Sequence, residues 1–257
     1  MEHTIKPART NSPQSDVKRL DIARPFHWLA LGWDDLTRNP FPSISQGLIL
    51  AAIGWLIIVI CSTQIELLTF AVSGFLLLGP IFGAGFYALS RLRANGQKAD
   101  FDTALDEAAK NIGSLARLGG ILAVIAIAWA IISRWLFQLE FGNQMPEVEV
   151  SFYRTIFEMR SPGFFMVYLA TGAVLAVVAF VISAVSAPMI FDRGGSTQKA
   201  IMTSFKVVTA NPFTMLLWAG MIAAMTIVGF ATLMAGLVII LPLIGHATWH
   251  AYKDIVG

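Results

Sequence analysis

Apolar residues occur along this chain in blocks long enough to cross a lipid bilayer. A transmembrane helix needs about 20 mostly apolar residues, because only intrahelical hydrogen bonds satisfy its backbone inside the hydrocarbon. Blocks of this kind predict four crossings: Ile44 to Thr63, Leu67 to Ser90, Leu118 to Phe137, and Pro162 to Phe191.

The last apolar block, Val207 to Tyr252, is too long to be one crossing. Its 46 residues carry no formal charge, and as a single helix they would extend roughly 69 Å. A bilayer has about 30 Å of hydrocarbon. The chain must therefore turn back, and the glycines between Gly229 and Gly236 predict where, giving a fifth helix from Phe213 and a sixth ending near Tyr252.

The basic residues give the six crossings an orientation. In a six-helix arrangement, 15 of the 18 Lys and Arg residues lie on one side, and only Arg134, Arg154 and Arg160 lie on the other. Positive charge favours the cytoplasmic side. We therefore expect a multi-pass protein of the bacterial cell inner membrane with both termini in the cytoplasm, in which residues 1–24 form a disordered cytoplasmic tail and residues 25–257 a single six-helix transmembrane domain.

A repeat organises the crossings. An amphipathic segment precedes the first, third and fifth crossings, and two of these segments end in the same tripeptide, Asn-Pro-Phe, at Asn39-Pro40 and Asn211-Pro212. The other segment has Asn111 in the equivalent place without a proline. The pattern predicts an all-α fold of three repeats, each an interfacial amphipathic helix plus a transmembrane hairpin. The Asn-Pro step fits a helix N-cap followed by proline at the first helical position.

Each return crossing carries a proline: Pro80, Pro188 and Pro242. A proline inside a helix frees a backbone carbonyl and favours a kink. The three kinks either serve packing alone or shape a central cavity, as in transporters with broken helices. In the second crossing, Gly79 and Gly83 form a small-residue pair typical of close helix packing, and a permeation path lined by glycines is the alternative.

The loop from Gln138 to Ser161 is the one sizeable segment predicted on the far side of the membrane. Val148, Val150 and Phe152 alternate with polar residues, which is consistent with a short strand. The segment is interpreted as a solvated loop, with a cap over the bundle or a docking surface as alternatives.

Composition excludes several function classes. The chain is 56% hydrophobic and 13% charged, about half the charged share of a soluble domain. The net charge of +2 is too small for nucleic-acid binding, so the lipid bilayer is the expected partner and nucleic acid is not. We assign no catalytic residue, no metal site and no cofactor, and expect no enzyme, because no nucleotide, zinc-protease or nucleophile motif occurs.

Two histidines are the candidates for a cofactor-binding site. His246 and His250 are four residues apart and so share a helix face, a spacing that suits a metal or haem edge. No carboxylate is close in the sequence. The alternative is a pair of interfacial histidines in an aromatic belt at the cytoplasmic end.

Five stretches carry a resemblance to a known family: GWDDL (32–36), LGPIF (78–82), FYALSRL (86–92), SAPMIFDR (186–193) and GHATWHAYKD (245–254). They resemble a prokaryotic family of uncharacterised predicted integral membrane proteins, some of whose members are labelled putative cytochrome c oxidase subunits. The resemblance implies a domain of unknown function, and the respiratory oxidase enters as a partner complex by analogy only. This chain lacks the many intramembrane histidines of a haem-copper catalytic subunit.

Two functions are consistent with the sequence. The first is a non-enzymatic structural, accessory or assembly factor for a membrane complex, and the second is a small-solute transporter or channel. The scarcity of buried ionisable residues favours the first, whereas a polar cavity spanning the repeats would favour the second.

Overall fold

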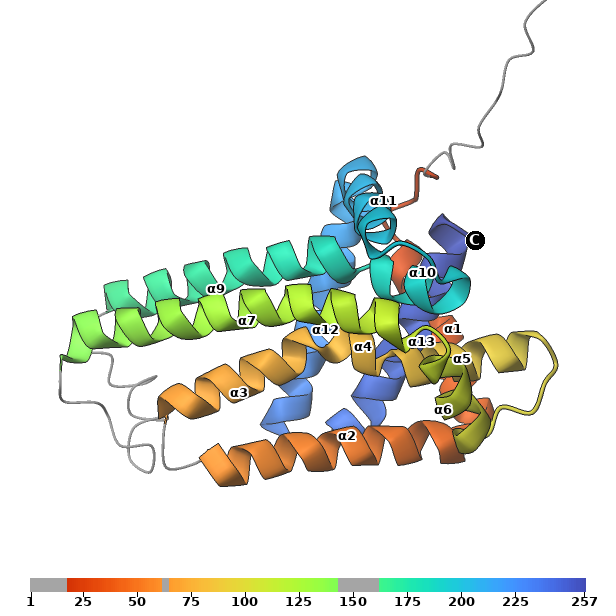
Figure 1. The fold of residues 1–257 in the computed structure, drawn as a ribbon, viewed down its shortest axis with the longest axis horizontal. Coiled ribbons are helices and arrows are strands. Elements are labelled where there is room, and N and C mark those ends of the chain that lie inside the picture. Colours follow the sequence, from red (N-terminus) through yellow and green to blue (C-terminus); the bar gives the residue numbers. More distant parts are fainter. Residues whose placement is uncertain (1–17, 62–64, 143–161) are drawn as a thin grey trace, which may run out of the picture.

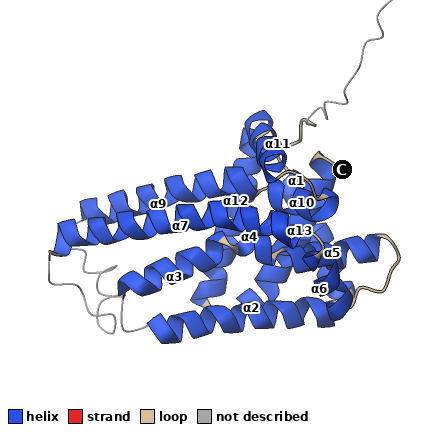
Figure 2. Cartoon of the chain, viewed as in Figure 1, coloured by secondary structure: helices blue, strands red, loops and turns tan. Residues whose placement is uncertain are grey.

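A computed structural model of the protein describes residues 18–61, 65–142 and 162–257, and within these ranges the chain forms helices and no strand (Figures 1 and 2). The all-α prediction is therefore confirmed for the described residues. Residues 1–17, which make up most of the predicted tail, and the predicted strand around Val148 to Phe152 lie outside these ranges.

Four helical stretches are long and apolar enough to cross a membrane. They are α2 (Pro40–Cys61), α7 (Ile112–Phe141), the stretch Gly163–Arg193 that contains α9 (Pro162–Ser183) and α10 (Ser186–Arg193), and α12 (Pro212–Ala231). A fifth passes the same test as a bent pair, Phe70–Leu77 with Gly79–Ala94, and includes the end of α3 (Ile65–Leu77), α4 (Gly79–Phe82) and α5 (Ala84–Ala94). All five were expected from the apolar blocks.

The last apolar block turns back where its glycines predicted. Helix α12 ends at Ala231, and α13 (Leu237–Ile255) begins five residues later. The turn contains two non-glycine residues with positive φ, Leu233 and Met234. Met234 is buried against Gly54 in α2, and its packing compensates for the strained backbone. Helix α13 does not qualify as a membrane span, because its C-terminal half contains two histidines and two charged residues.

Three amphipathic helices stand at the predicted positions before α2, α7 and α12. They are α1 (Arg24–Arg38), α6 (Phe101–Ala109) and α11 (Thr197–Ala210). In Figure 1, α2, α3, α7 and α9 lie side by side, while the hairpin of α12 and α13 runs at a steep angle to them in this view. All three amphipathic helices lie towards the same end of the bundle.

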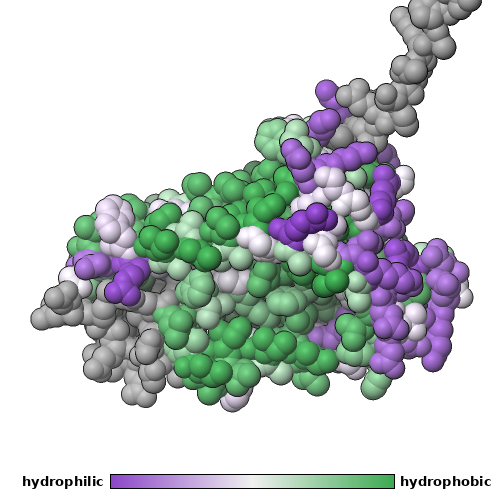
Figure 3. Space-filling model, in the orientation of Figure 1, coloured by the Kyte–Doolittle hydropathy of each residue, from purple (hydrophilic) through white to green (hydrophobic). Residues whose placement is uncertain are grey.

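The surface is divided between a polar end and an apolar body. Figure 3 shows hydrophilic residues gathered at the end formed by α5, α6 and α10, whereas the sides of the long helices are hydrophobic. Large apolar side chains on these helices are exposed, including Trp55, Val124, Val174 and Leu216. An apolar belt of this extent is what lipid contact requires, because a soluble protein rarely exposes a contiguous patch of more than a few hundred Å².

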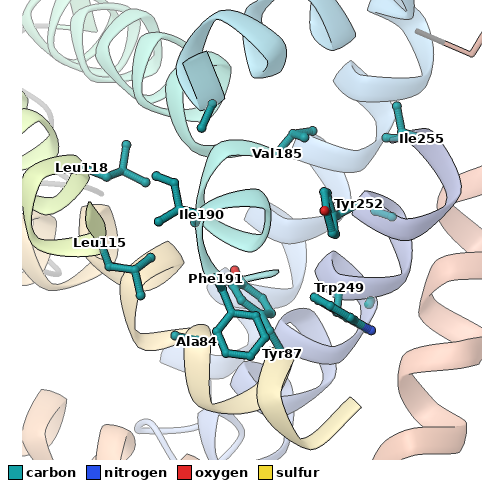
Figure 4. Close-up of a cluster of buried hydrophobic side chains, with 14 of the residues drawn as sticks. Ala84, Tyr87, Leu115, Leu118, Val185, Ile190, Phe191, Trp249, Tyr252 and Ile255 are labelled. Carbon is teal, nitrogen blue, oxygen red and sulfur yellow. The ribbon is translucent and has the colours of Figure 1, made fainter. Parts of the chain in front are cut away.

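The core lies at the polar end, where the helices converge. Tyr87 and Trp249 stack with ring centroids 6.5 Å apart, and the Phe191 ring meets that of Trp249 edge-on at 5.8 Å (Figure 4). Trp28 and Trp218 pack in the same core at 5.8 Å. Aromatic rings from five helices, α1, α5, α10, α12 and α13, therefore fill this core, which positions the polar groups described next.

Candidate functional site

The candidate site is a network of polar side chains where α1, α2, α5 and α13 meet. Helices α1 and α13 approach closely at Gly32, where an added Cβ would lie 2.7 Å from the backbone nitrogen of Ala247. Helices α2 and α13 approach equally closely at Gly47, where a Cβ would lie 2.2 Å from the carbonyl oxygen of Val238. Only glycine fits at these contacts, and they bring polar residues of distant segments within bonding distance.

Asp35 is the centre of the network. Its carboxylate is 6% exposed and accepts a hydrogen bond from the Ser90 hydroxyl at 2.6 Å. Nε2 of His250 lies 2.7 Å from the same oxygen, Oδ2, and Arg93 donates to Oδ1. The carboxylate is therefore held by residues from α5 and α13, 55 to 215 positions away in the chain.

His246 extends the network into the interior. Its side chain is 1% exposed, with Nδ1 at 2.8 Å from the Ser90 hydroxyl and Nε2 at 3.0 Å from the Ser43 hydroxyl. Because the Ser90 proton is given to Asp35, the Ser90 oxygen accepts from Nδ1–H. In a neutral imidazole Nε2 then accepts the single Ser43 proton, for which the Asn39 carbonyl at 3.1 Å is the competing acceptor. A continuous line of hydrogen bonds thus joins Ser43, His246, Ser90 and Asp35.

The electrostatics of α1 favour the ionised carboxylates. Burial raises the pKa of Asp35, but the hydrogen bonds from His250 and Ser90 outweigh it, and the pKa lies below the ordinary value of 3.8. The neighbouring Asp34 also has a lowered pKa, because Arg93 and Arg38 donate hydrogen bonds to it. Both aspartates are therefore anionic at neutral pH, although only Asp35 is buried.

Two further aspartates join the ends of the chain to the same region. Asp254 in α13 receives bonds from Lys18 at 3.1 Å, Arg24 at 2.7 Å and the indole nitrogen of Trp28 at 3.0 Å. Residues 18–23, predicted as part of a disordered tail, thus adjoin α13 through the Lys18 contact. Asp192 at the end of α10 accepts from the Tyr252 hydroxyl at 2.8 Å. The described N-terminal segment and the C-terminal helix are therefore in direct contact.

The three asparagines of the predicted repeat make equivalent contacts. Each donates from its side-chain amide to a backbone carbonyl shortly before an amphipathic helix: Asn39 to Ala99, Asn111 to Phe191 at 3.1 Å, and Asn211 to Lys18 at 3.0 Å. These carbonyls precede α6, α11 and α1 respectively. The third contact therefore leads back to the first amphipathic helix, so the three contacts form a closed cycle. In the same order α6 packs on α5, α11 on α10, and α1 on α13.

The Asn-Pro steps begin helices, but not by the predicted capping. Pro40 and Pro212 are the first residues of α2 and α12, as expected. Asn211 precedes α12 without a side-chain cap, because its amide bonds residues 18–20 instead, accepting from the Leu20 N–H at 2.8 Å. The predicted side-chain N-cap is therefore wrong at Asn211.

The prolines of the return crossings differ in what they do. Pro80 and Pro188 lie in the first turn of α4 and α10, and each of these helices begins directly after an interruption of the preceding helix. At the interruption before Pro80 the span bends by 44°. Pro242 alone lies inside a described helix, α13, where it packs against Gly47. The 44° bend confirms the predicted kink at Pro80, whereas Pro188 follows a short interruption between α9 and α10 within the one span Gly163–Arg193.

The predicted packing glycines are not the ones that pack between helices. An added Cβ at Gly79 meets nothing within 4 Å, and at Gly83 it meets the side chain of Tyr87 in the following helix. The close helix contacts are instead at Gly32 and Gly47, against α13. A short sequence motif identifies small residues but does not show which of them faces a neighbouring helix.

Both candidate histidines lie in the network, His246 buried and His250 partly exposed. Their nitrogen atoms are directed at Ser43, Ser90 and Asp35. Among the described residues, no group of three or more His, Cys, Asp or Glu side chains could hold a metal ion. Chemically, the arrangement can hold an ionised carboxylate at Asp35. A change in the hydrogen bonding of Asp35 can also alter, through Ser90, the hydrogen bonds of the buried His246.

Comparison with known proteins agrees with this picture. A family model described as "Predicted integral membrane protein (DUF2189)" matches residues 67–192, from α3 to α10. This part of the chain is similar to that family of predicted integral membrane proteins. The family resemblance is thereby confirmed, and the protein is an integral membrane protein with several apolar helices. No curated protein and no solved structure matches the chain.

Sequence reasoning missed Asp35, Ser43, Ser90 and Arg93 as members of the site. A signal for part of it was present, because Asp35 and Ser90 lie in the GWDDL and FYALSRL stretches and the histidines in GHATWHAYKD. Three of the five stretches that carry the family resemblance therefore meet in one place. Their convergence was not predictable without the fold.

Proposed function

We propose that the protein is a non-enzymatic structural or accessory component of a membrane complex in the bacterial inner membrane. The observation that carries this proposal is the use of the polar residues at the cytoplasmic end. Asp35, Asp192 and Asp254 each bond side chains from another segment of the same chain. Such bonds fix the relative positions of helices, as expected of a scaffold.

The packing around these residues supports the same reading. Of the described residues, none has a buried side-chain nitrogen or oxygen without a hydrogen-bond partner. The aromatic core of Tyr87, Phe191, Trp249 and Tyr252 fills the space beneath the network. A transport path or catalytic centre directs polar groups towards a ligand, whereas here they are directed towards one another.

Six crossings in three repeats are part of the proposal. The contact between Lys18 and Asp254 supports our placing both described ends of the chain on one side of the membrane, an arrangement that goes with an even number of crossings. Five stretches pass as spans, so α13 supplies the sixth by returning from the turn after α12. The cyclic contacts of Asn39, Asn111 and Asn211 support the threefold repetition.

The orientation follows from the basic residues. The polar end in Figure 3 includes the parts of the chain that are richest in Lys and Arg. Among these parts are α5, α6 and the C-terminal end of α13. The excess of positive charge favours the cytoplasmic side for this end. Both described ends of the chain are then cytoplasmic, whereas residues 143–161, which were predicted on the far side, lie outside the described residues.

A small-solute transporter or channel is the second candidate, and the broken helices favour it. The helix is interrupted at Leu78 and again between α9 and α10, each time shortly before a proline. Discontinuous helices at equivalent positions in repeats are typical of transporter binding sites.

The test is purification of the full chain from native membranes in mild detergent, with mass spectrometry of copurifying proteins and an absorption spectrum. An accessory protein recovers the same membrane proteins at fixed stoichiometry, and oxidase subunits with a haem spectrum would identify the respiratory complex. Reconstituted protein alone should give no solute flux above empty liposomes. Recovery of the protein by itself, together with solute flux, would replace this proposal by the transporter.

A further inference from the structure

A groove opens on the surface between α7 and α11, at the junction of two of the predicted repeats. It has a volume of about 450 Å³ and is lined by Arg117, Ile121, Thr197, Gln198, Ile201 and Met202. Its lining is almost entirely apolar apart from the groups at one end. An apolar groove with a few polar groups at one end suits an amphipathic ligand.

The groove lies where the surface changes from polar to apolar. Between Arg117 and Arg134, the exposed large side chains along α7 are apolar and include Ile121, Val124, Ile127 and Ile131. Lipid hydrocarbon is the medium that suits such a stripe. Arg117 therefore lies at headgroup level, with the groove extending from it towards the acyl chains.

The charge at the groove is suited to a phosphate. Arg117 donates to the neutral Ser114 hydroxyl at 2.8 Å, and within the described part of the chain it forms no ion pair with a carboxylate. Lys199, on the adjoining turn of α11, is also exposed. A guanidinium binds phosphate oxygens with charge-assisted hydrogen bonds.

The neighbouring junction repeats this combination. A smaller groove of about 280 Å³ lies between the start of α12 and the segment before α1, where Arg19 stands beside apolar Ile22 and Phe213. In the order of the repeats this junction follows the α7–α11 junction. A basic residue beside a surface groove thus occurs at both junctions, although the second groove has polar as well as apolar lining.

We propose that the groove between α7 and α11 binds one anionic diacyl phospholipid. Arg117 holds the phosphate, and an acyl chain lies along Ile121, Ile201 and Met202. The lipid joins the second and third repeats at a junction where helix contacts are sparse. This inference concerns the chain and the bilayer alone, so it does not depend on the identity of any partner complex.

The experiment is native mass spectrometry of the purified full chain after delipidation and addition of phosphatidylglycerol, phosphatidylcholine or inorganic phosphate. We expect one phosphatidylglycerol to be retained by the wild type and by Lys98→Gln, which removes the same charge at a fully exposed site away from the groove. Arg117→Gln should lower retention about fivefold, the effect of one basic residue near an anionic surface. Met202→Trp should lower it as well by filling the groove while Arg117 remains.

Circular dichroism and gel filtration of each variant show whether it is folded, and both substituted side chains are exposed. The proposal is overturned if Arg117→Gln and Met202→Trp retain the lipid as the wild type does. It is equally overturned if phosphatidylcholine is retained to the same extent, because the site would then not select an anionic headgroup, or if inorganic phosphate is retained and phosphatidylglycerol is not, because the site would then bind a free anion and no lipid.

Discussion

Removing the carboxylate of Asp35 should destabilise the protein more than any other single change at the polar end. In Asp35→Ala, Ser90 and His250 each lose a charge-assisted hydrogen bond, and Arg93 is left with Asp34 as its remaining partner. Breaking a buried charge pair by removing one member costs about 3–5 kcal/mol. The Arg93 side chain is 27% exposed and can regain water, so we expect the lower end, about 3 kcal/mol.

The neighbouring residue provides a matched control. Asp34→Ala removes the same carboxylate from the same helix and also breaks a bond to Arg93, but the Asp34 side chain is 43% exposed. Exposed ion pairs contribute little to stability, so the change should be small. The assay is unfolding of each purified variant by sodium dodecyl sulfate in mixed micelles, followed by circular dichroism. Equal losses of unfolding free energy in the two variants would refute the central place given to Asp35.

Three further predictions concern packing, the repeat and pH. Gly47→Ala should destabilise the folded protein by about 1–3 kcal/mol, because the added Cβ would overlap the backbone of α13. The same unfolding assay measures this loss. Gly74→Ala is the control and should be tolerated, because its Cβ would meet nothing within 4 Å. Asn211→Ala should speed hydrogen exchange at the Leu20 amide, which it now holds, and unchanged exchange would contradict the contact. Because the pKa of Asp35 is lowered in the folded protein, its contribution is present above the unfolded value of 3.8 and is lost as the pH falls through the folded value. Stability should therefore decline in acid for the wild type and decline less for Asp35→Ala.

The crossings were predictable because membrane insertion depends on a property that the sequence displays directly. Long apolar blocks give the approximate bounds of α2, α7 and α12, and excess length alone required the turn after α12. The bend in the second block agrees with the kink favoured by Pro80, but the interruption of the helix at Leu78 was not predicted, because Leu78 and its neighbours are apolar or small.

The polar network was largely unpredictable, because its members are held together by tertiary contacts alone. His250 lies 215 residues from Asp35, and nothing in either local pattern identifies the other as its partner. The spacing of His246 and His250 correctly placed them near each other on one helix. Without the position of α1 beside α13, no carboxylate could be assigned to them.

In the repeat, too, the features that depend on local sequence were predictable, and those that depend on tertiary contacts were not. The recurring Asn-Pro-Phe tripeptide correctly indicated where α2 and α12 begin. Whether the Asn211 amide would cap its own helix or bond another segment depends on what lies within reach of it. Residues 18–20 are within reach, and they belong to the part of the chain that was expected to be a free tail.

The contact between Lys18 and Asp254 is the main support for our proposal of an even number of crossings in three repeats. The direct measurement is cross-linking with a short bis-maleimide in native membranes, on a Cys61→Ser background that removes the one native cysteine. Lys18→Cys with Asp254→Cys should cross-link within one chain, whereas Lys18→Cys with Leu233→Cys, at the turn after α12, should not. Absence of the first cross-link, with residues 18 and 254 labelled from opposite sides of the membrane, would contradict the account.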